Sequence, residues 1–257
     1  FAIMSSTEAI RLLALEPCGP PDGDILDASL KSLRFAGMHV DYQPYDRGAG
    51  ERLGERGVAE RLSQLNAGLG GTHYDYLLCV RGGYGASDLL SLINWPALAR
   101  MNPRPLIGFS DVSALQSAFY TRLQWPSLHA PMPGSPLWAN GPDVNQLTGY
   151  LQKGRPWYGA ISVTPLKAKG QEVCTGLLFG GCLSVLTNLI GTAYLPASFA
   201  DHILFFEDTG ESASRVLRYW RQWLDCGLLE GVVAVVLGSF SKITADQSED
   251  WLRNEIG

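Results

Sequence analysis

Several features are missing from this sequence, and each absence narrows the range of functions. The 257 residues carry a formal net charge of −5, and no run of lysines or arginines occurs anywhere. Because nucleic-acid binders normally show a basic patch or stripe, the composition argues against a nucleic-acid partner. No stretch approaches the roughly 18 consecutive apolar residues of a membrane span, and the start lacks the charged and apolar regions of a signal peptide. We therefore expect a cytoplasmic protein that makes no membrane contact.

The few cysteines show no spacing that is typical of a disulfide framework or a metal site. The five cysteines are odd in number, widely scattered, and form no C-x-x-C pair. This pattern fits reduced thiols in a reducing compartment better than a disulfide framework or a zinc site. The four histidines are too dispersed for H-E-x-x-H or any close ligand pair, so we expect no metal and no cofactor. The residues concerned are Cys18, Cys79, Cys174, Cys182, Cys226, His39, His73, His129 and His202.

What is present predicts an α/β fold. Residues 10–15 are an apolar run, residues 25–35 carry apolar side chains at helical spacing, and residues 39–42 alternate as a strand does. Strand, helix and strand in this order are typical of a parallel βαβ unit. Further buried strands are predicted at residues 74–80 and 106–107. The N-terminal part is therefore expected to be a parallel-sheet α/β domain.

A break in the pattern predicts a second domain. Between residues 141 and 170 the helical spacing degrades into loop-like segments with several prolines and lysines. Beyond them, apolar strands are predicted near residues 177–179, 203–206 and 232–237. We expect an N-terminal domain over residues 1–155, a linker over 156–170, and a smaller, β-rich C-terminal α/β domain over 171–257.

The stretch PLIGFSDVSAL, residues 105–115, reads as a strand, a sharp turn and a helix, with Ser110 at the turn. A serine there has its hydroxyl at the end of a sheet, beside backbone N–H groups that favour developing negative charge. The second glycine of the hydrolase motif G-x-S-x-G is missing. Serine is also a preferred helix cap, and caps far outnumber nucleophiles. Taken alone, this stretch therefore favours a cap.

A glycine-rich loop follows the preceding strand. Gly82, Gly83 and Gly85 lie in RGGYG directly after residues 74–80. The dinucleotide fingerprint G-x-G-x-x-G is not met, and no acidic residue closes a second strand at the expected distance, so a nucleotide site is the weaker interpretation. The glycines do allow backbone to approach a ligand closely. Because parallel strands end at one sheet edge, this loop and Ser110 are expected there together.

Two carboxylates, Glu207 and Asp208, end the apolar strand near residue 206. Each is either a solvated loop residue, a helix cap, or a group that orients an imidazole or an amine. Together with Ser110, Glu207 becomes a candidate orienting acid of a serine hydrolase. The base is harder to identify. His129 alone follows a plausible active edge, and a lone histidine in a loop is more often structural.

Taken together, the motifs resemble the LD-carboxypeptidase family of serine peptidases, which includes murein tetrapeptide carboxypeptidases and microcin self-immunity peptidases. The resemblance covers nearly the whole chain. It rests on VRGGYG at residues 80–85, IGFSDVSAL at 107–115, GGCLS at 180–184, LIGT at 189–192, LFFED at 204–208 and VLGSF at 236–240.

The resemblance implies a two-domain enzyme with a Ser-His-Glu triad. Ser110 would be the nucleophile, and Glu207 would orient the histidine. The backbone N–H groups of Gly83 and Asp111 would form the oxyanion hole. The substrate would contact the loop through Arg81, Gly82 and Tyr84. The family's tendency to dimerise implies a homodimer.

The sequence departs from the family pattern at two points. Cys182 stands where the family usually has asparagine. The family's catalytic histidine lies in a Gly-His motif beyond the strand that ends at Gly238, and no such motif occurs before Gly257. We expect that histidine beyond Gly257.

The function implied by the resemblance is acyl transfer from a peptide C-terminus. The enzyme would release D-alanine from murein tetrapeptide during cell-wall recycling, because RGGYG looks more like the murein-recycling members. One alternative is a microcin-type immunity peptidase that cleaves a peptidyl or aminoacyl nucleotide. Another is a ligand-binding relative that performs no hydrolysis.

Overall fold

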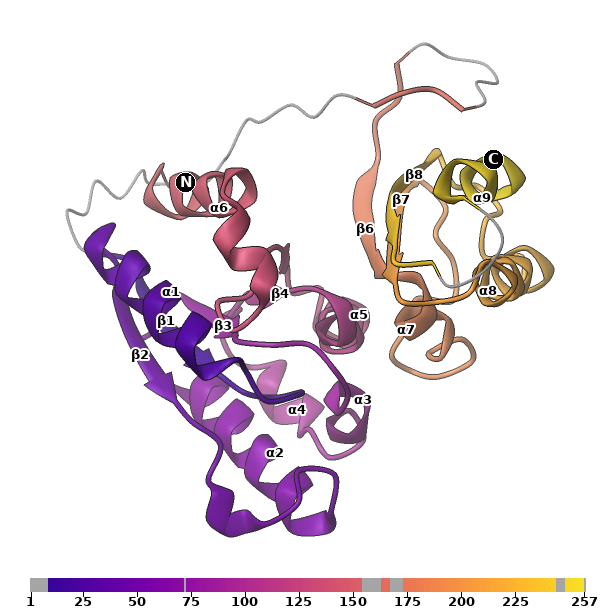
Figure 1. Cartoon of the computed structure of the whole chain (residues 1–257). Helices are drawn as coiled ribbons and strands as arrows, with labels where there is room; N and C mark the ends of the chain where they lie inside the picture. Colours follow the sequence, from indigo (N-terminus) through magenta and orange to yellow (C-terminus); the bar gives the residue numbers. More distant parts are fainter. Residues whose placement is uncertain (1–8, 72, 154–162, 167–172, 244–247, 257) are drawn as a thin grey trace. The chain divides into compact units, whose positions relative to one another are not determined.

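The computed structural model describes residues 9–71, 73–153, 163–166, 173–243 and 248–256 (Figure 1). The chain divides into two units. The first comprises Phe1–Val112 and Leu123–Tyr158, and the second Ser113–Arg122 and Gly159–Gly257. The predicted linker, residues 156–170, falls outside the described residues except for 163–166. Each unit has a parallel sheet of its own.

The first unit is built on five parallel strands in the order β2-β1-β3-β4-β5. Central β3 pairs with β1 on one side and with β4 on the other, so their carboxyl ends lie at one edge of the sheet. The chain therefore delivers the loops after β1, β3 and β4 to the same place. The strands are β1 (Arg11–Leu15), β2 (His39–Gln43), β3 (Tyr76–Cys79), β4 (Leu106–Gly108) and β5 (Leu128–His129).

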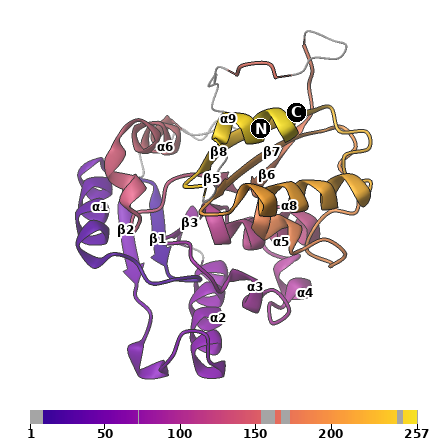
Figure 2. The same ribbon diagram turned by 45° about the vertical axis from the view of Figure 1, so that its right-hand side comes forward.

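Helices cover both faces of this sheet, and α1 and α2 lie on opposite sides (Figures 1 and 2). Asp22 begins α1 by accepting a hydrogen bond from the Ile25 N–H at 3.3 Å, which satisfies an otherwise unpaired donor. The helices of this unit are α1 (Gly23–Phe35), α2 (Glu55–Gly70), α3 (Ala86–Leu89), α4 (Trp95–Leu98) and α6 (Pro142–Lys153), with 3-10 turns at η1 (Arg47–Ala49), η2 (Ser110–Val112) and η3 (Pro136–Asn140).

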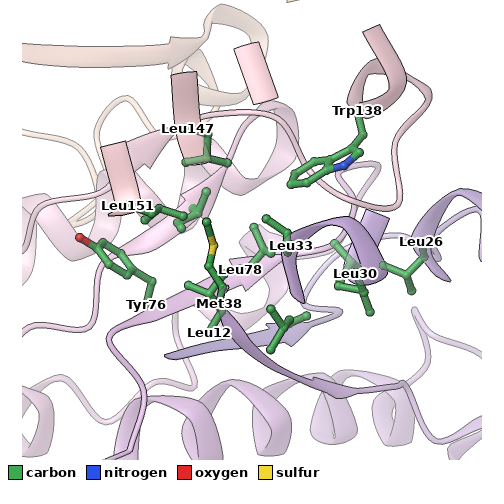
Figure 3. Packing of buried hydrophobic residues seen from close by; sticks show 14 residues of the cluster. Leu12, Leu26, Leu30, Leu33, Met38, Tyr76, Leu78, Trp138, Leu147 and Leu151 are labelled. Atoms are coloured by element: carbon green, nitrogen blue, oxygen red, sulfur yellow. The ribbon is translucent and has the colours of Figure 1, made fainter. Parts of the chain in front are cut away.

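Alternate residues of the strands serve the two faces, as the two-residue period of a strand requires. On one face, Leu12 and Leu78 pack with Leu30 of α1 and Leu147 of α6 (Figure 3). On the other face, α2 approaches so closely that a Cβ added at Gly68 would lie 3.0 Å from Leu77. The sheet is therefore buried on both faces. Functional side chains are accordingly expected in the loops at its edges.

The second unit has a three-stranded parallel sheet in the order β6-β7-β8. Helix α8 packs against α7 and α9, and α9 also contacts β8. The buried Trp223 of α8 packs on Phe206 of β7, with ring centroids 4.8 Å apart. The elements are β6 (Leu177–Cys182), α7 (Leu183–Thr187), β7 (His202–Thr209), α8 (Ala213–Asp225), β8 (Ala234–Ser241) and α9 (Glu249–Ile256).

Helix α5 (Ser113–Leu123), which follows the Ser110 turn, groups with the second unit apart from its last residue. The Ser117 hydroxyl donates to the Tyr194 carbonyl at 2.6 Å, and the Tyr120 hydroxyl lies 2.8 Å from His202 Nε2. The predicted α/β class, a larger parallel-sheet part followed by a smaller one, is confirmed.

Candidate active site

The Ser110 turn connects β4 to a 3-10 turn and then to α5. Ser110 has φ +60°, in the left-handed region that residues with a Cβ seldom adopt. The turn is tight, since a Cβ added at Gly108 would lie 3.0 Å from the Val112 side chain. Strained backbone of this kind clusters at functional sites, where surrounding structure holds it in place.

The glycine-rich loop after β3 lies against the serine. A Cβ added at Gly82 would lie 3.0 Å from the Ser110 Cβ and 3.1 Å from its Oγ. Only glycine therefore fits there without displacing the hydroxyl. Gly83 has φ +105°, so the loop turns directly beside Ser110. The expectation that these two loops meet at one sheet edge is confirmed.

Asp111 is buried, and its side chain points away from solvent with 5% exposure. It accepts a hydrogen bond from the Ala86 N–H at 2.9 Å and another from the Cys18 thiol. Burial raises the pKa of Asp111, and these hydrogen bonds oppose that shift. The carboxylate thus ties the serine turn to the start of α3.

The polar side chains of the RGGYG loop have partners within the first unit. Arg81 donates to the Gly134 carbonyl at 2.9 Å, which anchors the loop after β5. Tyr84 is 57% exposed, and its hydroxyl donates to Asp88 at 2.9 Å. That hydrogen bond is the main reason why the pKa of Tyr84 is raised. More than half of the Tyr84 surface is therefore exposed to solvent.

A cavity of about 420 Å³ borders the residue before Ser110. Its walls come from β5, the loop that follows it and α6, and they are mostly apolar, with Asp143 and Gln146 supplying polar groups. His129 contributes its ring, which lies 6.1 Å from the ring of Phe109 between centroids. The lining residues are Phe109, Leu128, His129, Ala130, Pro131, Leu137, Asp143, Gln146, Leu147 and Tyr150.

Glu207 lies in the second unit, near the end of β7. Burial and the neighbouring charge of Asp208 raise its pKa to about 7. Asp208 plays a different part, since it is buried and accepts from the Ser184 N–H at 2.8 Å, at the start of α7. The two carboxylates are thus distinguished, one holding a helix and the other left with a perturbed pKa.

Cys182 occupies the junction between β6 and α7. Its backbone N–H donates to the Ser113 hydroxyl at 3.1 Å, and its thiol lies 3.4 Å from an Asp208 oxygen. Burial is the main reason why the pKa of this thiol is raised. The thiol is therefore neutral, and by donating to Asp208 it satisfies part of the hydrogen-bonding capacity of that carboxylate.

Among the described residues, no group of three or more histidine, cysteine, aspartate or glutamate side chains is arranged to hold a metal ion. Across the same part of the chain, no helix is both long and apolar enough to cross a membrane. Sequence reasoning missed two side chains near the serine turn, the Asp111 carboxylate and the buried Arg61. Their contacts join segments far apart in the chain, so neither carried a local signal.

Comparison with known proteins gives matches over most of the chain. The LD-carboxypeptidase N-terminal domain matches residues 11–130, and the LD-carboxypeptidase C-terminal domain matches residues 175–256. A murein tetrapeptide carboxypeptidase of Pseudomonas aeruginosa is 32% identical over 243 residues, which cover 90% of this chain and 76% of that protein.

Two solved structures share the fold. A muramoyltetrapeptide carboxypeptidase from Oxalobacter formigenes matches with a TM-score of 0.77 and 24% identity, over 96% of this chain and 84% of the other. The protein MccF in complex with glutamyl sulfamoyl guanosine matches with a TM-score of 0.76 and 18% identity, over the same shares of the two chains. At these identities the likeness concerns the fold.

Proposed function

Because the chain belongs to the LD-carboxypeptidase family, we propose that it is a serine-type enzyme releasing a C-terminal D-amino acid from a murein peptide. The proposed substrate is murein tetrapeptide, which loses D-alanine during cell-wall recycling. The observation that carries the proposal is the Ser110 turn, where a left-handed serine lies against Gly82 at the carboxyl edge of the sheet. The left-handed backbone of Ser110 and the close approach of the Gly82 backbone suit a nucleophile better than a simple helix cap.

The proposed mechanism is acyl transfer through a Ser-His-Glu triad. A histidine oriented by Glu207 takes the proton from the Ser110 hydroxyl as Oγ attacks the carbonyl carbon. The backbone N–H groups of Gly83 and Asp111 donate to the oxyanion. The C–N bond then breaks, the leaving amine of the D-amino acid takes the proton from the histidine, and water hydrolyses the acyl-enzyme.

Substrate recognition is assigned to the same loop. Gly82 offers backbone without a side chain, and Tyr84 offers an exposed ring. Arg81 is anchored to the Gly134 carbonyl, which holds its positive charge beside the loop and available to a peptide carboxylate. We assign these three residues to binding the C-terminal end of the peptide.

The setting proposed for this activity is the cytoplasm, with the protein a homodimer. Cys18, Cys79, Cys174, Cys182 and Cys226 are all free thiols, as a reducing compartment would keep them. The second candidate activity, cleavage of an aminoacyl nucleotide as in microcin immunity, is supported by the shared fold of MccF. A non-hydrolytic binder is the third candidate.

The decisive measurement is D-alanine release from murein tetrapeptide. We expect the full-length wild-type protein to release it and the full-length Ser110→Ala variant to lose at least about 10³-fold in kcat. Ser91→Ala, at an exposed serine elsewhere in the first unit, is the matched control and should keep full activity. No release by the wild type, or equal release by Ser110→Ala, would refute the proposal.

Two further assays separate the candidates. Equal cleavage of an aminoacyl sulfamoyl nucleotide analogue would favour the immunity activity. Intact-mass detection of an adduct on Ser110 with an acylating inhibitor distinguishes a hydrolase from a binder. A protein that binds the tetrapeptide but forms no adduct and releases no D-alanine would be the non-hydrolytic relative.

A further inference from the structure

Arg61 of helix α2 is completely buried, with 0% exposure. A buried charge is costly unless it is paired and fully hydrogen-bonded. Here all three guanidinium nitrogens have partners. Nη2 pairs with Asp88 at 2.9 Å, Nη1 donates to two backbone carbonyls, and Nε donates to a third. So complete a set of contacts indicates that the position of this side chain is fixed.

The carbonyls that Arg61 binds belong to three separate loops. Nη1 donates to Pro17, after β1, at 2.8 Å and to Gly85, after β3, at 2.6 Å. Nε donates to Arg52, in the segment before α2, at 3.2 Å. One rigid, planar group thus joins loops that are up to 44 residues away along the chain. The first two of these loops lie at the carboxyl edge of the sheet.

Gly85 makes the contact with Arg61 especially close. Its φ is +133°, and a Cβ placed there would overlap the Arg61 guanidinium. The last glycine of RGGYG is therefore required by Arg61, whereas Gly82 is required by Ser110. The loop is held from both ends, by the arginine at one and by the serine turn at the other.

The same loop is tied to the serine turn at a third point. The residue after Gly85 is Ala86, whose N–H donates to the Asp111 carboxylate at 2.9 Å. The Gly19 N–H donates to the Gly82 carbonyl at 2.7 Å. Gly19 lies in the loop after β1, which Arg61 also binds, so that loop supports the glycine-rich loop as well. A displacement of Arg61 would therefore shift Gly83 from both sides, through Gly82 and through Gly85.

We propose that Arg61 is a positioning residue that holds loop 82–86 against Ser110, and through it the Gly83 N–H that receives the oxyanion. The inference rests on the proposed function for its catalytic consequence. Arg61 touches neither substrate nor the reacting atoms. Its effect comes from preorganisation, because an N–H donor displaced by about 1 Å loses much of its preference for the transition state.

The test compares Arg61→Lys, which keeps the charge and loses the planar fork, with the wild type. We expect kcat for D-alanine release to fall about 10- to 100-fold, with KM within about 3-fold, because the oxyanion contact forms only in the transition state. Hydrogen–deuterium exchange of residues 81–88 should rise, while exchange of α1 stays unchanged. Arg104→Met is the matched control. Arg104 donates to the Gly71 carbonyl, in the segment that leads into β3, at the edge of the sheet opposite to the serine turn.

Exchange decides the structural claim whatever the substrate. Unchanged exchange of residues 81–88, or a uniform rise over the first unit, would overturn the proposal, as would unchanged kcat in folded Arg61→Lys. Should that variant fail to fold, Asp88→Asn weakens the ion pair with Arg61 at a side chain that is 23% exposed. It must show the same local rise in exchange of residues 81–88. A wild type that releases no D-alanine refutes the proposed function, and the exchange result then still decides whether Arg61 holds the loop.

Discussion

At the scale of single residues, Ser110 combines two roles that the sequence pattern sets against each other. It opens the 3-10 turn that leads into α5, as a cap would, and it does so with φ +60°. A residue used only as a cap has no need of left-handed backbone, because Asp22 and Ser212 cap their helices in the extended region. The backbone of Ser110 therefore sets it apart from the ordinary caps of the same chain.

Glu207 predicts a pH dependence of stability. Its folded pKa is raised from the usual 4.5 to about 7 by burial and by Asp208. The folded state therefore binds this proton more tightly, and the resulting stabilisation is complete below pH 4.5 and lost as the pH rises through 7. Glu207→Gln cannot titrate. Relative to the wild type, it should gain on the order of 2–3 kcal/mol between pH 4 and pH 8.

Urea unfolding at several pH values measures this difference. Glu230→Gln is the matched control, because Glu230 is an exposed carboxyl of the same unit. Its stability relative to the wild type should not show the rise that is expected of Glu207→Gln. If Glu207→Gln follows the wild-type pH dependence in parallel, the carboxyl has an ordinary pKa and the prediction fails.

At the scale of elements, the short helix α7 depends on a side chain from another strand. Its preceding residue Cys182 makes no side-chain cap, and Asp208 of β7 accepts from the Ser184 N–H and hydroxyl instead. A carboxylate at a helix N-terminus is also favoured by the helix dipole. The strand that carries Glu207 is thereby joined to the helix that follows β6.

Removing this cap should destabilise the protein. Asp208→Ala removes the acceptor of the partly buried Ser184 N–H and hydroxyl, and we expect a loss of about 2–3 kcal/mol in the free energy of unfolding. Asp208→Asn keeps an acceptor and should lose less. Asp225→Ala, at the exposed end of α8, serves as the control in the same urea titrations. Equal midpoints for Asp208→Ala and wild type would contradict the capping role.

At the scale of the whole molecule, the proposed dimer predicts the mass in solution. The homodimer should sediment at equilibrium with twice the mass of the chain used, which is 27.9 kDa for residues 1–257. The mass should hold on dilution through the micromolar range, as expected of a stable homodimer. A single species with the mass of one chain at tens of micromolar would contradict the proposal.

The sequence by itself determined the class of fold and the meeting of the two loops. Apolar runs alternating with helical spacing specify parallel strands, and parallel strands end at one edge, so Gly82 and Ser110 had to come together. The backbone angle of Ser110, the burial of Arg61 and the grouping of α5 with the second unit were decided only by the tertiary structure. Each depends on contacts between distant segments, such as Arg61 with Pro17, and the residues flanking Arg61 specify only that it lies on a helix.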